Sequence, residues 1–185
     1  MTHRCFVVVS GLPGSGKTTL ARQLAPALGL SLIDKDDILD RLFESRGVGD
    51  DAWRRTLSRE SDTLLQTEAR ASQGAVLVSF WHRPGMPEDS GTPTGWLVEL
   101  PGRVVEVHCQ CEAEIAAARF MQRRRHPGHL DGNTSYAEVL ADFRFLAGLG
   151  SLAIGPRVDI DTSRDIGLDP AVRDIRTAFE RAGIN

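Results

Sequence analysis

The stretch Gly11-Leu12-Pro13-Gly14-Ser15-Gly16-Lys17-Thr18-Thr19 decides the fold of this 185-residue chain. It fits the pattern G-x-x-x-x-G-K-[ST], in which glycines let the backbone approach phosphate, a lysine reaches the β- and γ-phosphates, and a hydroxyl reaches Mg²⁺. An apolar run precedes it at residues 5–10, and leucines at four-residue spacing follow it within residues 18–28. The pattern therefore predicts a P-loop between a buried parallel strand and a helix, where N–H groups converge on an anion.

Lysine is rare elsewhere in the chain, which uses arginine for nearly all its positive charge; the two lysines are Lys17 and Lys35. A lysine is a compact point charge that a planar guanidinium does not replace, so its use in the loop favours phosphate binding. We expect Lys17 to act in catalysis and Thr18 to bind the metal. The residues expected to hold ATP in this loop are Gly11, Pro13, Gly14, Ser15, Gly16, Lys17, Thr18 and Thr19.

The composition is that of an ordinary soluble globular protein, with 41% hydrophobic and 25% charged residues. We expect a single domain over residues 1–185. The net charge of −3 does not favour nucleic-acid binding, and no apolar run is long enough to span a membrane. Three cysteines do not make a disulfide framework, so the sequence favours a cytoplasmic protein. It leaves the oligomeric state open.

Strand-like and helix-like segments alternate along the rest of the chain, which predicts an α/β fold with a parallel sheet and helices on both faces. Ligands then bind beyond the carboxyl ends of the strands. Further strands are expected at residues 30–33, 75–80, 103–109 and 157–161, and helices around 38–43, 52–72, 112–124, 136–147 and 170–181. The loops that should share one site are 11–19, 34–37, 80–85 and 162–165.

Two carboxylates, Asp34 and Asp36, follow the second expected strand. Phosphoryl transfer to a hydroxyl needs a carboxylate to orient that hydroxyl, and often another near Mg²⁺. We expect Asp36 to be the base and to contact the acceptor, and Asp34 to belong to the metal shell. The alternative is helix capping, because acidic side chains satisfy first-turn amides.

An arginine cluster follows the fourth expected strand. Arg119 and Arg123 are four residues apart, and Arg124 and Arg125 extend the cluster to a Pro-Gly break. A positive lid, about residues 119–134, would stabilise developing charge and exclude water. We expect Arg123 on phosphate, as a catalytic group, and Arg119 near the adenine. The alternatives are a solvated basic face and a surface for an acidic partner.

The remaining expected strand ends supply further candidates. Trp81, His82 and Arg83 are placed to shape an acceptor pocket, although Trp81 equally suits the core. Thr162 and Ser163 should border the base of the nucleotide. His126 and His129 form H-x-x-H, but no flanking ligands support a metal site, which favours a role in lid structure or phosphate contact.

These residues resemble the small P-loop kinases of the nucleoside-monophosphate-kinase type over nearly the whole chain. Asp34-x-Asp36 is similar to the D-x-D of shikimate-kinase-like enzymes, whose second Asp is the base, and Arg119-x-x-x-Arg123 is similar to their lid pair. The resemblance implies a three-layer P-loop NTPase fold with five strands in the order 2-3-1-4-5, ATP and Mg²⁺ as cofactors, and transfer of the γ-phosphoryl group to a small acceptor. The string Arg125-His126-Pro127-Gly128-His129 resembles a bacterial subgroup of AAA-type ATP-binding proteins.

Three departures of this sequence from the patterns of related families narrow the range of possible functions. No strand ends in a clear Walker-B Asp with a sensor pattern, which argues against a motor ATPase. Polynucleotide 5′-hydroxyl kinases carry an Arg where this chain has Leu39, so nucleic acid is an acceptor that the sequence does not favour. The third strand lacks the glycine cluster of shikimate kinases, which argues against shikimate. Two classes remain: a kinase acting on a hydroxyl of a nucleoside, sugar or antibiotic-like molecule, and a regulatory NTP-binding module with slow hydrolysis.

Overall fold

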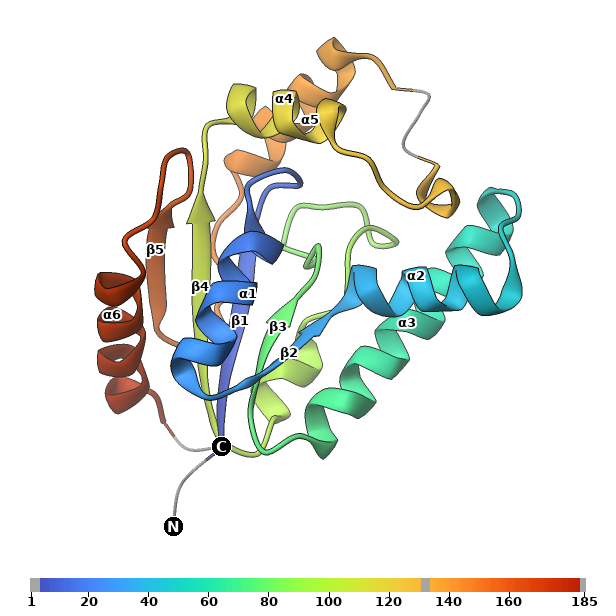
Figure 1. Ribbon diagram of the computed structural model, residues 1–185. Helices are drawn as coiled ribbons and strands as arrows, with labels where there is room; N and C mark the ends of the chain where they lie inside the picture. The colour runs from blue at the N-terminus through green and yellow to red at the C-terminus, as the bar shows by residue number, and fades with distance from the viewer. Residues whose placement is uncertain (1–3, 131–133, 184–185) are drawn as a thin grey trace.

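The computed structural model describes residues 4–130 and 134–183. Its centre is a sheet of five parallel strands in the order β2-β3-β1-β4-β5 (Figure 1). This order confirms the topology that the resemblance implied. The strands are β1 (Cys5–Gly11), β2 (Ser31–Asp34), β3 (Ala75–Val78), β4 (Arg103–Gln110) and β5 (Arg157–Asp161).

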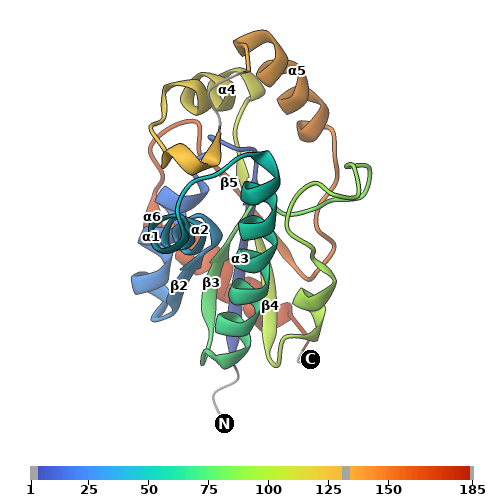
Figure 2. The ribbon, with the colours of Figure 1, turned by 90° about the vertical axis from the view of Figure 1, so that its right-hand side faces the viewer.

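Helices cover both faces of the sheet, because the central strands are apolar almost continuously and so present apolar side chains on both faces. Helices α1 (Lys17–Leu28) and α6 (Leu168–Arg181) pack on Val7 and Val9 of β1. Helix α3 (Asp51–Ala71) and the 3₁₀ helix η1 (Gly95–Glu99) pack on the other face (Figures 1 and 2). The three layers leave the carboxyl ends of the strands uncovered by α1, α3 and α6.

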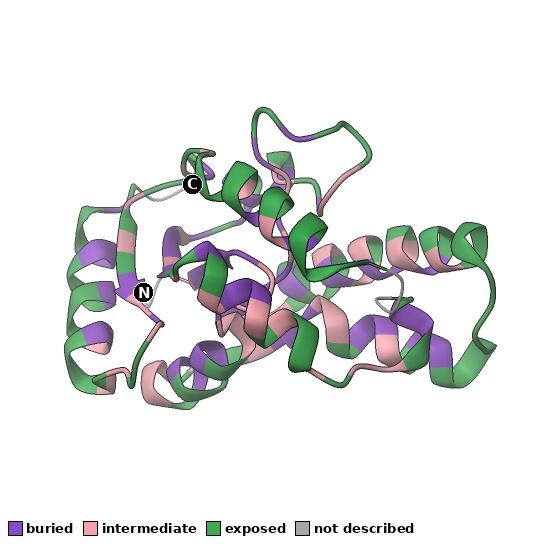
Figure 3. Ribbon diagram, turned by 90° about the horizontal axis from the view of Figure 1, so that it is seen from above, coloured by how far each residue is buried: buried purple, intermediate pink, exposed green. Residues whose placement is uncertain are grey.

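A helical lid lies over those strand ends (Figures 1 and 3). It consists of α4 (Ala113–Gln122), the 3₁₀ helix η2 (Pro127–His129) and α5 (Tyr136–Ala147). Helix α5 begins in a capping box between Ser135 and Glu138, and its Phe143 packs with α4 and Leu12 of the P-loop. The lid expected at residues 119–134 includes residues 131–133, which lie outside the described residues.

Several boundaries differ by a few residues from the sequence expectation, and the differences at α2 and α4 move site residues. Helix α2 (Lys35–Arg46) begins directly after β2, because the Asp34 side chain accepts the backbone N–H of Asp36 as an N-cap. Asp36 therefore lies in the first turn of a helix. Helix α4 ends at Gln122, and Arg123 is an extended C-cap, so Arg123 does not continue the helical face of Arg119.

Within residues 4–130 and 134–183, no helix has both the length and the apolar character needed to cross a membrane.

Candidate active site

The P-loop connects the buried strand β1 to α1, as expected, and its glycines take conformations that other residues adopt only with strain. Gly16 is the N-cap of α1 with φ of 89°. Gly14 has φ of 76°, and a Cβ there would lie 2.3 Å from the carbonyl oxygen of Ala116 on α4. The loop is therefore in close contact with the lid.

Lys17 folds back over the loop. Its Nζ donates to the carbonyl oxygens of Gly11 at 3.1 Å and of Leu12 at 2.8 Å. Burial lowers the pKa of Lys17 to about 8, because the ammonium is taken out of water. A phosphate next to this Nζ would stabilise the charged form, which suits the lysine to an anionic ligand.

The side chains of Thr18 and Asp34 meet at the start of α1. The Thr18 hydroxyl donates to Asp34 Oδ2 at 2.7 Å, and the Asp36 N–H donates to Asp34 Oδ1 at 3.0 Å. Burial raises the pKa of Asp34 to about 6, and the hydrogen bonds from Thr18 and from the Asp36 amide act against that rise. Asp34 therefore both caps α2 and places an oxygen beside Thr18.

The Thr18 and Asp34 oxygens fit a magnesium ion. Mg²⁺ prefers oxygen donors, and in nucleotide sites it uses one or two protein groups together with phosphates and waters. Among the residues that the structure describes, no group of three or more His, Cys, Asp or Glu side chains is arranged to hold a metal. Thr18 and Asp34 would supply the protein oxygens of such a site, and nucleotide phosphates and waters would supply the rest.

Arg119 closes a cleft of about 490 Å³ beside the P-loop. Its guanidinium donates to the carbonyl oxygens of Thr162 at 2.8 Å and Ser163 at 3.0 Å, which ties α4 to the loop between β5 and α6. Gly16 and Thr19 line the same cleft. The structure thus brings together five of the residues that the sequence assigned to the nucleotide.

Arg123 lies just beyond α4. Its guanidinium is 4.2 Å from the centre of the Phe120 ring, and this cation–π contact holds it against the lid.

Asp36 is half-exposed on the first turn of α2, and its Oδ2 pairs with Arg125 at 2.6 Å. The three residues after β3 take different positions. Trp81 is 2% exposed and donates its indole N–H to the carbonyl oxygen of Val9, which favours the core interpretation. His82 Nδ1 lies 2.8 Å from the carbonyl oxygen of Ser90, within its own loop. Arg83 is 5% exposed and reaches the carbonyl oxygen of Leu146.

A polar network around Lys35 was missed by the sequence analysis. Lys35 Nζ lies 2.6 Å from Asp62 Oδ1, and it donates to Thr92 Oγ1 at 3.1 Å. Thr92 is fully buried, donates to Asp62 and lies 2.6 Å from the Ser79 hydroxyl. The rarity of lysine was the one available signal, since nothing in sequence links Asp62 to Thr92.

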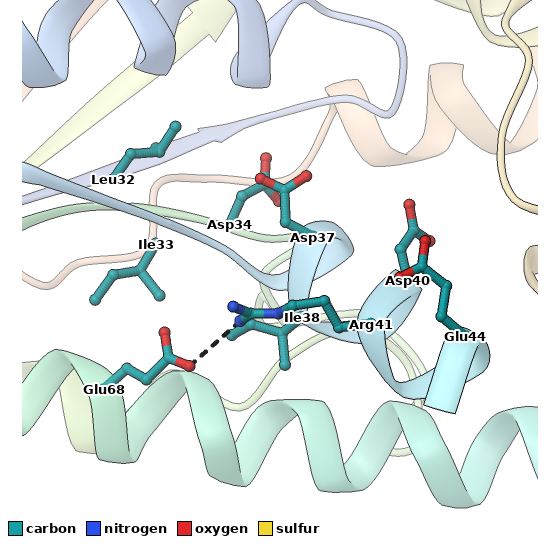
Figure 4. Close-up of a pocket in the computed structure, with 9 residues that line it drawn as sticks. All are labelled: Leu32, Ile33, Asp34, Asp37, Ile38, Asp40, Arg41, Glu44 and Glu68. Atoms are coloured by element: carbon teal, nitrogen blue, oxygen red, sulfur yellow. Dashed lines mark hydrogen bonds and ion pairs between the residues drawn. The ribbon is translucent and has the colours of Figure 1, made fainter. Parts of the chain in front are cut away.

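A second cavity of about 310 Å³ lies between β2, α2 and α3 (Figure 4). Its lining residues are Leu32, Ile33, Asp34, Asp37, Ile38, Asp40, Arg41, Glu44 and Glu68. The ion pair of Arg41 and Glu68, at 3.4 Å, spans it from α2 to α3. This cavity shares no lining residue with the cleft beside the P-loop.

A family model described as an AAA domain matches residues 6–141. A shikimate kinase of Corynebacterium glutamicum is 37% identical over 72 residues, which covers 38% of this chain and 43% of that relative. Shikimate kinase 2 of Pectobacterium carotovorum is 31% identical over 127 residues, 65% of this chain and 64% of that relative. The chain thus spans less than two thirds of the length of these curated relatives.

Among solved structures, one from Chloroflexus aurantiacus, provisionally described as a kinase, is similar with a TM-score of 0.71 and 23% identity. The similarity covers 96% of this chain and 99% of that one. At this level of identity, the likeness establishes the P-loop kinase fold.

Proposed function

The chain belongs to the AAA domain family, and on that premise we propose that it is a phosphotransferase. It moves the γ-phosphoryl group of ATP to a hydroxyl of a small molecule, within a single domain. The observation that carries this proposal is the arrangement of Thr18, Asp34 and Asp36 at the end of the P-loop. Asp36 is the residue that binding alone does not need, because only a transfer step requires a carboxylate beside an acceptor hydroxyl.

In the proposed reaction, Lys17 and the P-loop amides hold the β- and γ-phosphates of ATP. Arg119, together with Thr162 and Ser163, encloses the adenine ring. Mg²⁺, held by Thr18 and Asp34 together with the phosphates, would neutralise charge on the phosphate oxygens. Asp36 orients the acceptor hydroxyl and takes its proton as that oxygen bonds to the γ-phosphorus and ADP departs. Arg123 stabilises charge on the transferred group once the lid is closed over it.

The nature of the acceptor follows from the walls of the site. Two of the curated relatives are shikimate kinases, but the bulky Phe80 follows β3 here. Arg54 lies on the same inward face of α3 as Leu57 and Ser61, and its buried Nε has no hydrogen-bond partner among the residues that the structure describes. Arg54 belongs to the first turn of α3, and that end of the helix points toward the lid (Figure 2). We therefore propose a small hydroxylated acceptor that carries a negative group, such as a carboxylate or phosphate.

An acceptor screen tests the proposal. ATP consumption is measured with nucleosides, sugars, sugar acids, nucleotides, aminoglycosides, macrolides and 5′-hydroxyl oligonucleotides. Stimulation by an anionic small molecule supports the kinase, whereas stimulation by the oligonucleotides alone would identify a polynucleotide 5′-hydroxyl kinase. If none of these acceptors raises ATP consumption, the regulatory NTP-binding module becomes the better explanation.

The first prediction concerns the base. Asp36→Ala should reduce transfer by about a hundredfold or more, since positioned acid–base groups contribute 10²–10⁴ in rate, while ATP affinity changes only a few-fold. The matched control is Asp37→Ala, which removes an exposed carboxylate from the same turn and should leave transfer nearly intact. Normal transfer by Asp36→Ala would refute the assignment of the base.

A further inference from the structure

The lid segment Arg125-His126-Pro127-Gly128-His129 lies directly on helix α2. Its contacts fall on Asp36, Asp40 and Phe43, which are spaced four and three residues apart and therefore share one helical face. The segment thus joins the lid to the helix that carries the proposed base.

The contact with Asp36 is an ion pair. Arg125 Nη2 lies 2.6 Å from Asp36 Oδ2, and the side chains are 18% and 50% exposed, respectively. A half-exposed carboxylate in a first helical turn has several rotamers open to it. Arg125 selects one of them and engages Oδ2, so that Oδ1 is the oxygen left to face a hydroxyl.

The two histidines hold the segment against α2. His129 is 3% exposed, and its Nε2 donates to Asp40 Oδ1 at 2.7 Å. The Phe43 ring stacks on His126, with centroids 5.2 Å apart and planes within 10°, and meets the edge of His129 at 5.5 Å. These contacts fix the backbone from which Arg125 extends.

The glycine between the histidines is required by packing. A Cβ on Gly128 would lie 2.7 Å from three atoms of the Phe43 ring, closer than real Cβ atoms approach. The amide of Gly128 donates to His126 Nδ1 at 3.2 Å, which keeps the turn compact. The sequence of this segment therefore fits the surface of α2 at four of its five positions.

We propose that residues 125–129 form a clamp that sets the geometry of the base, with Arg125 as a positioning residue for Asp36. This inference rests on the proposed phosphotransferase function. Because Arg125 belongs to the lid, Asp36 is fixed only while the lid lies on α2. The clamp therefore links lid closure to assembly of the transfer site and limits loss of the phosphoryl group to water.

The first test measures the clamp without using activity. Backbone hydrogen exchange of residues 128–130 is compared in the full chain, in Gly128→Ala and in Gly150→Ala, since a Cβ on Gly150 meets nothing within 4 Å. We expect faster exchange only in Gly128→Ala. Equal exchange in all three proteins would show that the segment is not held on α2.

The second test is a double-mutant cycle on ATP turnover, with the best acceptor from the screen and also with water as acceptor. Arg125→Met should lower kcat roughly ten- to hundredfold, as expected when a reacting group is misplaced, with the KM for ATP within twofold. Arg125→Lys should restore part of the loss. In an Asp36→Ala background, Arg125→Met should cause no further loss.

Asp40 provides the conservative comparison. Asp40→Asn keeps an oxygen acceptor for His129 and should retain most of the turnover. Asp40→Ala removes that acceptor and should lower kcat in the same way as Arg125→Met. An equal loss from Arg125→Met with and without Asp36, or a rise in the KM for ATP with unchanged kcat, would overturn the inference. No stimulation by any acceptor, together with faster exchange in Gly128→Ala, would refute the proposed kinase and leave the clamp standing.

Discussion

At the scale of single residues, Lys17 and Asp34 are both ionisable groups held away from water beside the P-loop. Burial lowers the pKa of Lys17 to about 8 and raises the pKa of Asp34 to about 6, so burial penalises the charged form of each group. Polyphosphate beside Lys17 and a cation beside Asp34 would each remove that penalty. The site is therefore suited to a ligand that combines a polyphosphate with a bound cation.

Lys17→Ala should weaken ATP binding at least about tenfold and abolish turnover, because hydrogen bonds to charged groups contribute about 1.5–3 kcal/mol. Calorimetric titration with ATP measures the affinity. Arg22→Ala, which removes an exposed cation from α1, is the control and should bind normally. ATP affinity equal to that of the unchanged protein would contradict the P-loop assignment.

At the scale of elements, the Lys35 network connects three parts of the chain. Lys35 belongs to α2, Asp62 to α3, and Thr92 to the long loop after β3. Both charged side chains are mostly buried, at 12% and 15% exposure. The network therefore fixes the first turn of α2, where Asp36 lies, relative to α3 and to the loop after β3.

Lys35→Met should lower the free energy of unfolding by on the order of 3 kcal/mol, since it leaves the buried Asp62 charge without its cation. The double variant Lys35→Met/Asp62→Leu should recover most of that loss. Urea unfolding measures both. Breaking the exposed pair of Arg70 and Glu99 with Arg70→Met should cost less than about 1 kcal/mol. Additive losses in the double variant would mean that the pair does not act as a unit.

At the scale of the whole molecule, a buried polar cluster joins the sheet to the segment before β5. Glu106 accepts the Ser10 hydroxyl at 2.7 Å and the backbone N–H of Leu152 at 3.0 Å. His108 Nδ1 lies 2.9 Å from Ser10 Oγ. Burial, together with the positive charges of Arg157 and Arg83, lowers the pKa of His108 to about 4. The fold therefore holds this imidazole neutral.

This shift predicts how stability depends on pH. An unfolded histidine takes up a proton near pH 6.5, whereas folded His108 does so near pH 4. Its contribution is therefore complete above pH 6.5 and is lost as the pH falls through 4. The free energy of unfolding should fall more steeply between pH 6.5 and 4 in the unchanged protein than in His108→Gln. Parallel urea titrations at several pH values measure the difference, and identical slopes would contradict the assignment.

Much of this molecule follows from local sequence. The apolar run of β1, the P-loop glycines and the leucines of α1 determine a strand, a turn and a helix, because each depends on neighbours in the chain. The alternation of strands and helices determines the parallel sheet, whose topology places the expected loops at one edge. The position of the site residues at that edge can therefore be predicted without any knowledge of long-range contacts. These residues are Lys17, Thr18, Asp34, Asp36 and Arg119.

Only the tertiary structure decided where the other groups point. Trp81 packs into the core instead of lining a pocket, Asp62 pairs with Lys35 across two elements, and Arg123 leaves the helix of Arg119. The clamp joins residues about ninety positions apart, Asp40 and His129. The physical reason is that a local pattern fixes backbone periodicity, whereas the partner of a polar side chain depends on which distant surfaces the packed fold brings within hydrogen-bond distance.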